Sequence, residues 1–123
     1  MKKGYFILLI LWLIVILVLL LMPANSLDRT PLILDIEHLD KIVHFVLFGV
    51  LSFLVLKNMQ YMKNPKINVA LLTIIMVSSF GIVTEILQLC MHNITERFFS
   101  VADIICDTVA SMTVVFCCTE LSK

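Results

Sequence analysis

Four long apolar segments follow one another in this sequence, and short polar stretches separate them. The first runs from Tyr5 to Met22, and the others are expected at about 40–57, 66–91 and 100–118. Each is close to the roughly 20 residues that a helix needs to cross a bilayer. The hydropathy pattern therefore predicts an all-α fold, an integral membrane bundle of four transmembrane helices.

The composition agrees with a membrane protein. The chain has 123 residues, of which 61% are hydrophobic and 15% charged, and its mean hydropathy is +1.08. An ordinary soluble domain is only about half apolar. Three Gly and three Pro leave no flexible linker, so residues 1–123 are expected to form a single domain. The formal net charge of zero argues against nucleic acid as a partner.

The first apolar segment has a second interpretation as a secretory signal peptide, with Ala24-Asn25-Ser26 as the cleavage site. Its apolar core is longer than the roughly 7 to 15 residues of a signal h-region. We therefore expect the segment to stay in the protein as its first transmembrane helix.

The basic residues predict the orientation in the membrane. With four spans, the two termini and the connector from Lys57 to Lys66 lie on one side, which carries six Lys, whereas the other side carries Arg29, Lys41 and Arg97. Positively charged residues stay inside. Both termini are therefore expected in the cytoplasm.

Polar residues interrupt the second and third apolar segments near one end. Asp40, Lys41 and His44 fall in the first turns of the second helix, and Asp40 is placed to orient the His44 ring because residues four apart share a face. In the third helix the small and polar side chains recur every three or four residues: Ser78, Gly81, Glu85, Gln88 and His92. This stripe is expected to face inward.

The last helix shows the same spacing. Ser100 is the expected N-cap, with Asp103 at the third position as in a capping box, after a turn over 92–99 that contains Arg97. Asp103 and Asp107 then share one face of the helix.

These groups are expected to meet at the extracytoplasmic surface. Ionisable groups in hydrocarbon cost roughly 2.5 to 3.5 kcal/mol each on insertion scales and usually mark a functional site. Glu85 in particular is expected to take up a proton or to pair with Lys41, Arg97 or His44. The candidate ligand-binding cluster comprises Asp40, Lys41, His44, Glu85, Gln88, Arg97, Asp103 and Asp107.

Less specific interpretations remain beside this one. Charges near the interface also occur simply as ion pairs that tie helix ends together. A metal site from His44, Glu85, His92, Asp103 and Asp107 has acceptable ligand types, but no HExxH or paired-Cys spacing supports it. We therefore expect no metal, no cofactor and no catalytic residue. The four cysteines are expected to be apolar fillers, with a Cys90–Cys106 bridge as the alternative.

The order of these motifs resembles the VanZ-like family of small bacterial membrane proteins. The resemblance lies in DKIVHFVLFGVLSF from Asp40, GIVTEILQ from Gly81, and then Arg97, Ser100 and Asp103. It covers the chain from Asp40 to about Ser111. Asp107 and Ala110 depart from the pattern, because the family usually has Asn and Gly at these positions. The resemblance implies a multi-spanning protein of the bacterial plasma membrane that is associated with the cell envelope. The founding member of the family is linked to low-level resistance to the lipoglycopeptide teicoplanin.

Three functions are consistent with the sequence. The first, which we favour, is a non-enzymatic envelope protein whose outer polar pocket binds an amphiphile, such as a membrane lipid headgroup, a lipid-linked molecule or a lipoglycopeptide. Lys41 and Arg97 are expected to bind an anionic group of this ligand, since basic side chains favour phosphate and carboxylate. The second is an intramembrane enzyme acting on a lipid-linked substrate, with His44 or Glu85 as general base and Arg97 stabilising charge. The third is a small transporter subunit or helix-packing partner. The sequence does not specify an oligomeric state.

Overall fold

The computed structural model describes residues 3–23, 36–61, 68–95 and 98–121, without the side chains of residues 36–40 and Thr95. These residues form helices and no strand. The elements are α1 (Lys3–Leu21), α2 (Ile36–Tyr61), α3 (Val69–Cys90), α4 (His92–Thr95) and α5 (Val101–Glu120). All but α4 are long and apolar enough to cross a membrane. The predicted all-α bundle with four membrane-spanning helices is confirmed.

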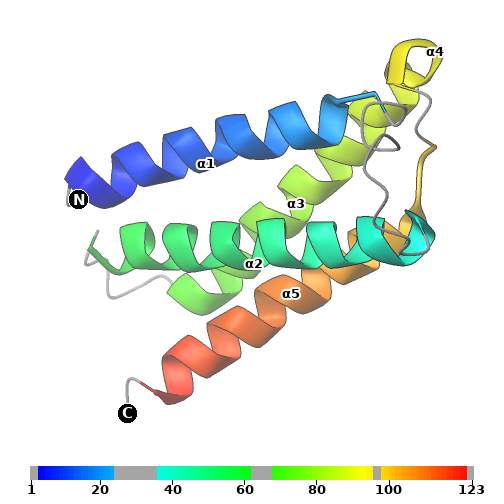
Figure 1. Cartoon of the computed structure of the whole chain (residues 1–123). Helices are drawn as coiled ribbons and strands as arrows, with labels where there is room; N and C mark the ends of the chain where they lie inside the picture. Colours follow the sequence, from blue (N-terminus) through cyan, green and yellow to red (C-terminus); the bar gives the residue numbers. More distant parts are fainter. Residues whose placement is uncertain (1–2, 24–35, 62–67, 96–97, 122–123) are drawn as a thin grey trace.

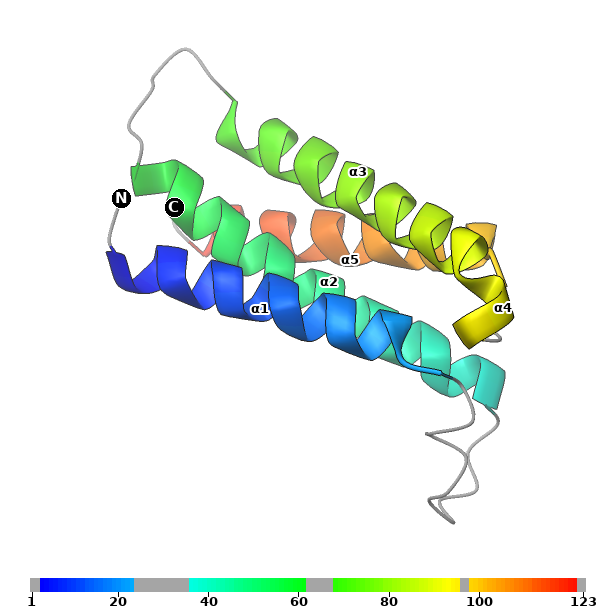
Figure 2. The same cartoon turned by 90° about the horizontal axis from the view of Figure 1, so that it is seen from above.

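The four long helices lie side by side and alternate in direction (Figure 1). Helix α2 is central, since it packs against α1, α3 and α5, with its most extensive contact on α5. The two chain termini lie at one end of the bundle, and the start of α2, the end of α3 and the start of α5 lie at the other (Figure 2). The antiparallel order thus gathers three segments that are distant in the sequence.

Helix α2 is longer than predicted. It continues to Tyr61, so that Asn58, expected in a connector, lies within it. Asn58 is 5% exposed, and its Nδ2 donates to the carbonyl oxygens of Leu54 at 2.9 Å and of Tyr5 at 3.1 Å. Because α1 supplies an acceptor for this amide, the polar residue does not end the helix.

The other helix ends show how local capping sets the boundaries. Helix α3 begins later than predicted because Asn68 is its N-cap and accepts from the Leu71 amide at 3.1 Å. The expected turn after α3 contains the short helix α4. The predicted N-cap of α5 is confirmed, since Ser100 Oγ accepts from the Asp103 amide at 3.3 Å.

The apolar core lies where α1, α2 and α3 meet. It is formed by Ile16, Leu20, Leu47, Phe48, Leu51, Val55 and Val77. Most of the remaining α1 side chains are exposed, as expected of a helix that faces lipid. Polar contacts attach α1 to the bundle: Trp12 Nε1 donates to the Leu47 carbonyl at 3.0 Å, and Gln88 Nε2 to the Leu20 carbonyl at 2.9 Å.

Candidate functional site

His44 lies at the centre of a buried polar cluster formed by α2, α3 and α5. Its side chain is fully buried, and its ring stacks on Phe48 one turn later, with the ring centres 5.8 Å apart and an interplanar angle of 4°. Nδ1 lies 3.0 Å from Asp107 Oδ1, and Nε2 lies 4.0 Å from Glu85 Oε1. The imidazole therefore stands between two carboxylates that come from different helices.

Glu85 connects α3 to the first turn of α5. Its Oε2 accepts a hydrogen bond from the Ser100 backbone N–H at 2.8 Å. In a capping box, the amide of the N-cap residue donates to a side chain of its own helix. Here the amide of the N-cap Ser100 donates to a carboxylate of another helix, so Glu85 stabilises the start of α5 while Oε1 faces His44.

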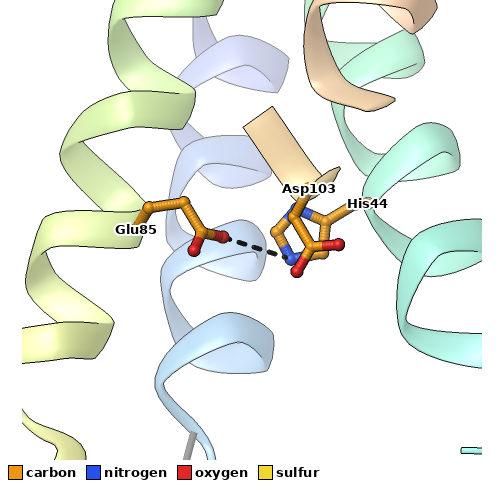
Figure 3. Close-up of side chains that lie close together, drawn as sticks. All are labelled: His44, Glu85 and Asp103. Atoms are coloured by element: carbon orange, nitrogen blue, oxygen red, sulfur yellow. Dashed lines mark ion pairs between the residues drawn. The ribbon is translucent and has the colours of Figure 1, made fainter. Parts of the chain in front are cut away.

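Asp103 completes the cluster from α5. Its side chain is buried, and in Figure 3 its carboxylate lies beside the His44 ring, on which Glu85 also converges from α3. One potential ligand atom each from His44, Glu85 and Asp103 lies within 4.8 Å of the others. Three elements thus direct metal-ligating or proton-exchanging groups at a single point.

Gly81 makes room for this arrangement. A Cβ atom at this position would lie 2.8 Å from Asp107 Oδ2, 3.3 Å from Asp107 Cβ and 3.4 Å from the Phe48 ring. The first distance is shorter than real Cβ contacts, so any larger side chain would have to displace Asp107. The absence of a side chain at Gly81 therefore lets α3 approach α5 beside the Asp107–His44 pair.

The remaining predicted residues lie outside this central group or are not described. Gln88 is buried on the same helix face as Glu85, but its amide binds the Leu20 carbonyl of α1. Lys41 is half-buried, one turn before His44. The Asp40 side chain and all of Arg97 fall outside the described residues.

His92 and the cysteines occupy different surroundings from those considered in the sequence. The His92 ring packs against Phe98, with the ring centres 4.5 Å apart, and His92 does not belong to the group of potential metal ligands. All four cysteines are free thiols, so the alternative of a Cys90–Cys106 bridge is wrong for this structure.

Sequence reasoning missed some buried polar groups and the packing role of Phe48. Thr84 is buried, and its hydroxyl donates to the Gly81 carbonyl at 2.7 Å. Phe48 stacks on the His44 ring, and its spacing of four from His44 is a signal in the sequence that the two rings share a helix face.

Among the described and buried side chains of the cluster, carboxylates predominate. The cluster combines Glu85, Asp103 and Asp107 with His44, and the buried residues that the structure describes include no Lys or Arg. Ionised carboxylates accept hydrogen bonds and cannot donate them. Several buried carboxylates are stable only when protons, hydrogen-bond donors or cations compensate their charge. The arrangement is therefore suited to holding protons, donor groups or a cation.

Comparison with known proteins supplies the family. A sequence model of the family described as VanZ/LLP1 matches residues 5–122, which is nearly the whole chain. No curated protein and no solved structure matches the chain. The match extends beyond the resemblance noted from Asp40 to Ser111 and includes the first helix. The chain is a multi-pass membrane protein that belongs to the VanZ/LLP1 family.

Proposed function

We propose that the protein acts in the bacterial cell envelope, where the cluster around His44 binds the polar head of an amphiphile at the extracytoplasmic surface and thereby lowers susceptibility to teicoplanin-type lipoglycopeptides. The observation that carries the proposal is the convergence of His44, Glu85 and Asp107 from three helices, all fully buried. Groups that are costly to bury are retained where they serve binding or chemistry.

The buried carboxylates of the cluster indicate which kind of amphiphile headgroup it would bind. The carboxylates of Glu85, Asp103 and Asp107 offer acceptors, which suit the hydroxyls of a sugar or the N–H groups of an amine. The three buried carboxylates favour a donor-rich headgroup, whereas Lys41, half-buried one turn from His44, and Arg97 are the groups that would bind an anionic one.

The surroundings of the cluster suit a molecule that lies partly in lipid. Phe98 is 75% exposed and Phe99 41% exposed, and both directly precede the N-cap of α5. Aromatic side chains are favoured at membrane interfaces. An amphiphile would pack its acyl chain near these rings while its polar head approaches the carboxylates.

One observation favours an intramembrane enzyme as the second candidate. The contact of 3.0 Å between Asp107 and His44 Nδ1 orients the imidazole so that Nε2 faces Glu85. A histidine oriented by a carboxylate is a common general base. An enzyme of this kind would act on a lipid-linked substrate, with His44 or Glu85 transferring the proton.

Single substitutions test these functions. His44→Asn, Glu85→Gln and Arg97→Lys are expressed in cells lacking the native protein, and membrane accumulation and lipoglycopeptide susceptibility are measured together. We expect normal accumulation and lost resistance for His44→Asn and Glu85→Gln. Glu120→Gln is the matched control, because Glu120 is an exposed carboxylate at the opposite end of the bundle.

The possible results separate the candidates. Lost accumulation would indicate that the charges only hold the helices together. A changed lipid product in mass spectra of the membrane would favour the enzyme. Unchanged accumulation and unchanged susceptibility in every variant would contradict a functional role for the cluster.

A further inference from the structure

We infer that His44, Glu85 and Asp103 form a binding site for a divalent first-row transition-metal ion, with Asp107 orienting His44. One potential ligand atom from each of the three residues lies within 4.8 Å of the others, and all three side chains are buried. The inference does not depend on the proposed binding of an amphiphile, and it departs from the expectation that no metal is bound.

The Asp107–His44 contact prepares the histidine for a metal. Asp107 Oδ1 lies 3.0 Å from Nδ1, and Phe48 stacks on the ring and fixes its plane. When Nδ1 carries the hydrogen and donates it to Asp107, the lone pair of Nε2 points toward Glu85. Histidines that bind metals usually donate their other ring N–H to a carboxylate or a carbonyl in this way.

Glu85 supplies the second ligand in a geometry that leaves one oxygen for the ion. The Ser100 N–H holds Oε2 at 2.8 Å, whereas Oε1 has no hydrogen-bond partner within the described part of the chain. Glu85 is fully buried. A buried carboxylate oxygen without a donor is costly, and a bound cation would remove that cost.

The distances and charges suit a small divalent ion. Ligand atoms about 2.0 to 2.1 Å from a tetrahedral Zn²⁺ lie about 3.3 Å from one another. His44 Nε2 and Glu85 Oε1 lie 4.0 Å apart, so metal binding would draw these two atoms closer together. The two carboxylate ligands, Glu85 and Asp103, carry charge of the opposite sign to that of the ion, and the imidazole binds it as a neutral ligand. The combination of imidazole and carboxylate suits Zn²⁺ or Mn²⁺ better than Ca²⁺ or Mg²⁺, which prefer oxygen ligands.

Direct metal measurement tests the site. The full chain is purified in detergent, loaded with Zn²⁺ or Mn²⁺ and desalted, and the bound metal is measured by plasma mass spectrometry, with affinities from calorimetry. We expect one ion per chain and a thermal transition that rises with metal concentration, since an ion that binds only the folded state stabilises it.

Variants assign the ligands. Loss of a residue that only orients a metal ligand weakens metal binding by roughly 10- to 100-fold. Asp103→Asn and Glu85→Gln each remove a direct ligand, so each is expected to weaken metal binding by more than this. Asp103→Glu, which keeps a carboxylate, should bind more tightly than Asp103→Asn. Glu120→Gln and a variant with Ser at all four cysteines should bind as the wild type does.

Several outcomes would overturn the inference. The first is a wild-type protein that holds no stoichiometric metal and shows no metal-dependent thermal shift. The second is unchanged metal binding by Asp103→Asn, and the third is loss of metal binding in the cysteine-free variant. If Asp103→Asn does not retain wild-type helix content in circular dichroism, the thermal shift of the wild-type and cysteine-free proteins decides the question. This experiment measures metal binding and does not measure antibiotic susceptibility. Failure of the metal inference can therefore be distinguished from failure of the proposed function.

Discussion

At Gly81, the addition of a single Cβ atom would directly disturb the cluster around His44. Gly81 lies on the inward face of α3, four residues before Glu85, and faces Asp107 of α5. Interhelical contacts in membrane proteins favour small residues because the backbones approach closely there. At Gly81 the small residue also preserves the position of a carboxylate that binds His44.

Replacing Gly81 by Ala should destabilise the protein by about 1 to 3 kcal/mol, the usual cost of overpacking. The new Cβ would lie 2.8 Å from Asp107 Oδ2, so Asp107 must move away from its present position beside His44. Thermal unfolding in detergent measures the effect.

Gly49→Ala is the matched control for this change. Gly49 is also a helical glycine within the bundle, but its added Cβ would meet only Val114 Cγ2, at an ordinary 3.6 Å. Equal stability of the two variants would show that Asp107 is not held by close packing against Gly81.

At the scale of elements, the start of α5 depends on two other parts of the chain. Ser100 caps the helix with its side chain, and its backbone N–H donates to Glu85 of α3. The same first turn presents Asp103 beside His44. Capping and site geometry are therefore coupled, because a shift of this turn would move Asp103 and Glu85 together.

Ser100→Ala should lower the free energy of unfolding by about 1 kcal/mol, within the range of roughly 0.5 to 2 kcal/mol for a lost N-cap. The variant loses the bond of 3.3 Å from the Asp103 amide but keeps the backbone bond to Glu85. Thermal unfolding followed by circular dichroism measures the change.

Ser79→Ala serves as the comparison, since Ser79 is an exposed serine in the middle of α3. Its effect should stay within about 0.5 kcal/mol, as for most surface substitutions. If Ser79→Ala cost as much as Ser100→Ala, the cap would have no special role.

The start of α2, the end of α3 and the start of α5 lie at the end of the bundle opposite the two termini (Figures 1 and 2). The helix bounds therefore place the cluster in this half of the molecule. The excess of Lys near the termini and in the connector after α2 predicts that this termini end lies in the cytoplasm. With that orientation, the cluster would lie in the half of the bundle nearer the outside of the cell.

Reporter fusions test that orientation. Alkaline phosphatase, which is active outside the cytoplasm, should be active when fused after Thr30, between α1 and α2, and inactive when fused after Asn64, between α2 and α3. A fluorescent protein that folds in the cytoplasm should show the reverse pattern. Activity of the two fusions with the opposite assignment would place the cluster on the cytoplasmic side.

The number of spans followed directly from the sequence, and the N-cap at Ser100 also needed only local information. A run of about 20 apolar residues forms a helix in lipid because its backbone groups have no other partners. The C-terminal end of α2 was harder to predict, because the amide of the polar Asn58 is satisfied partly by the Tyr5 carbonyl of α1, a contact between distant residues that the local sequence does not reveal.

The spacing of polar residues identified the faces on which Glu85 and Asp107 lie, but it did not identify their partners. Asp107, 63 residues away from His44, binds Nδ1 of its ring, and no pattern in the sequence indicated this pairing. The Asp40 side chain, which the sequence suggested for orienting His44, lies outside the described residues. It also placed Gln88 beside Glu85, although Gln88 binds α1. Partners depend on the rotation and depth of each helix, which close packing at positions such as Gly81 and Phe48 sets. Local hydropathy does not encode that rotation, so the meeting of His44, Glu85 and Asp103 is visible only in three dimensions.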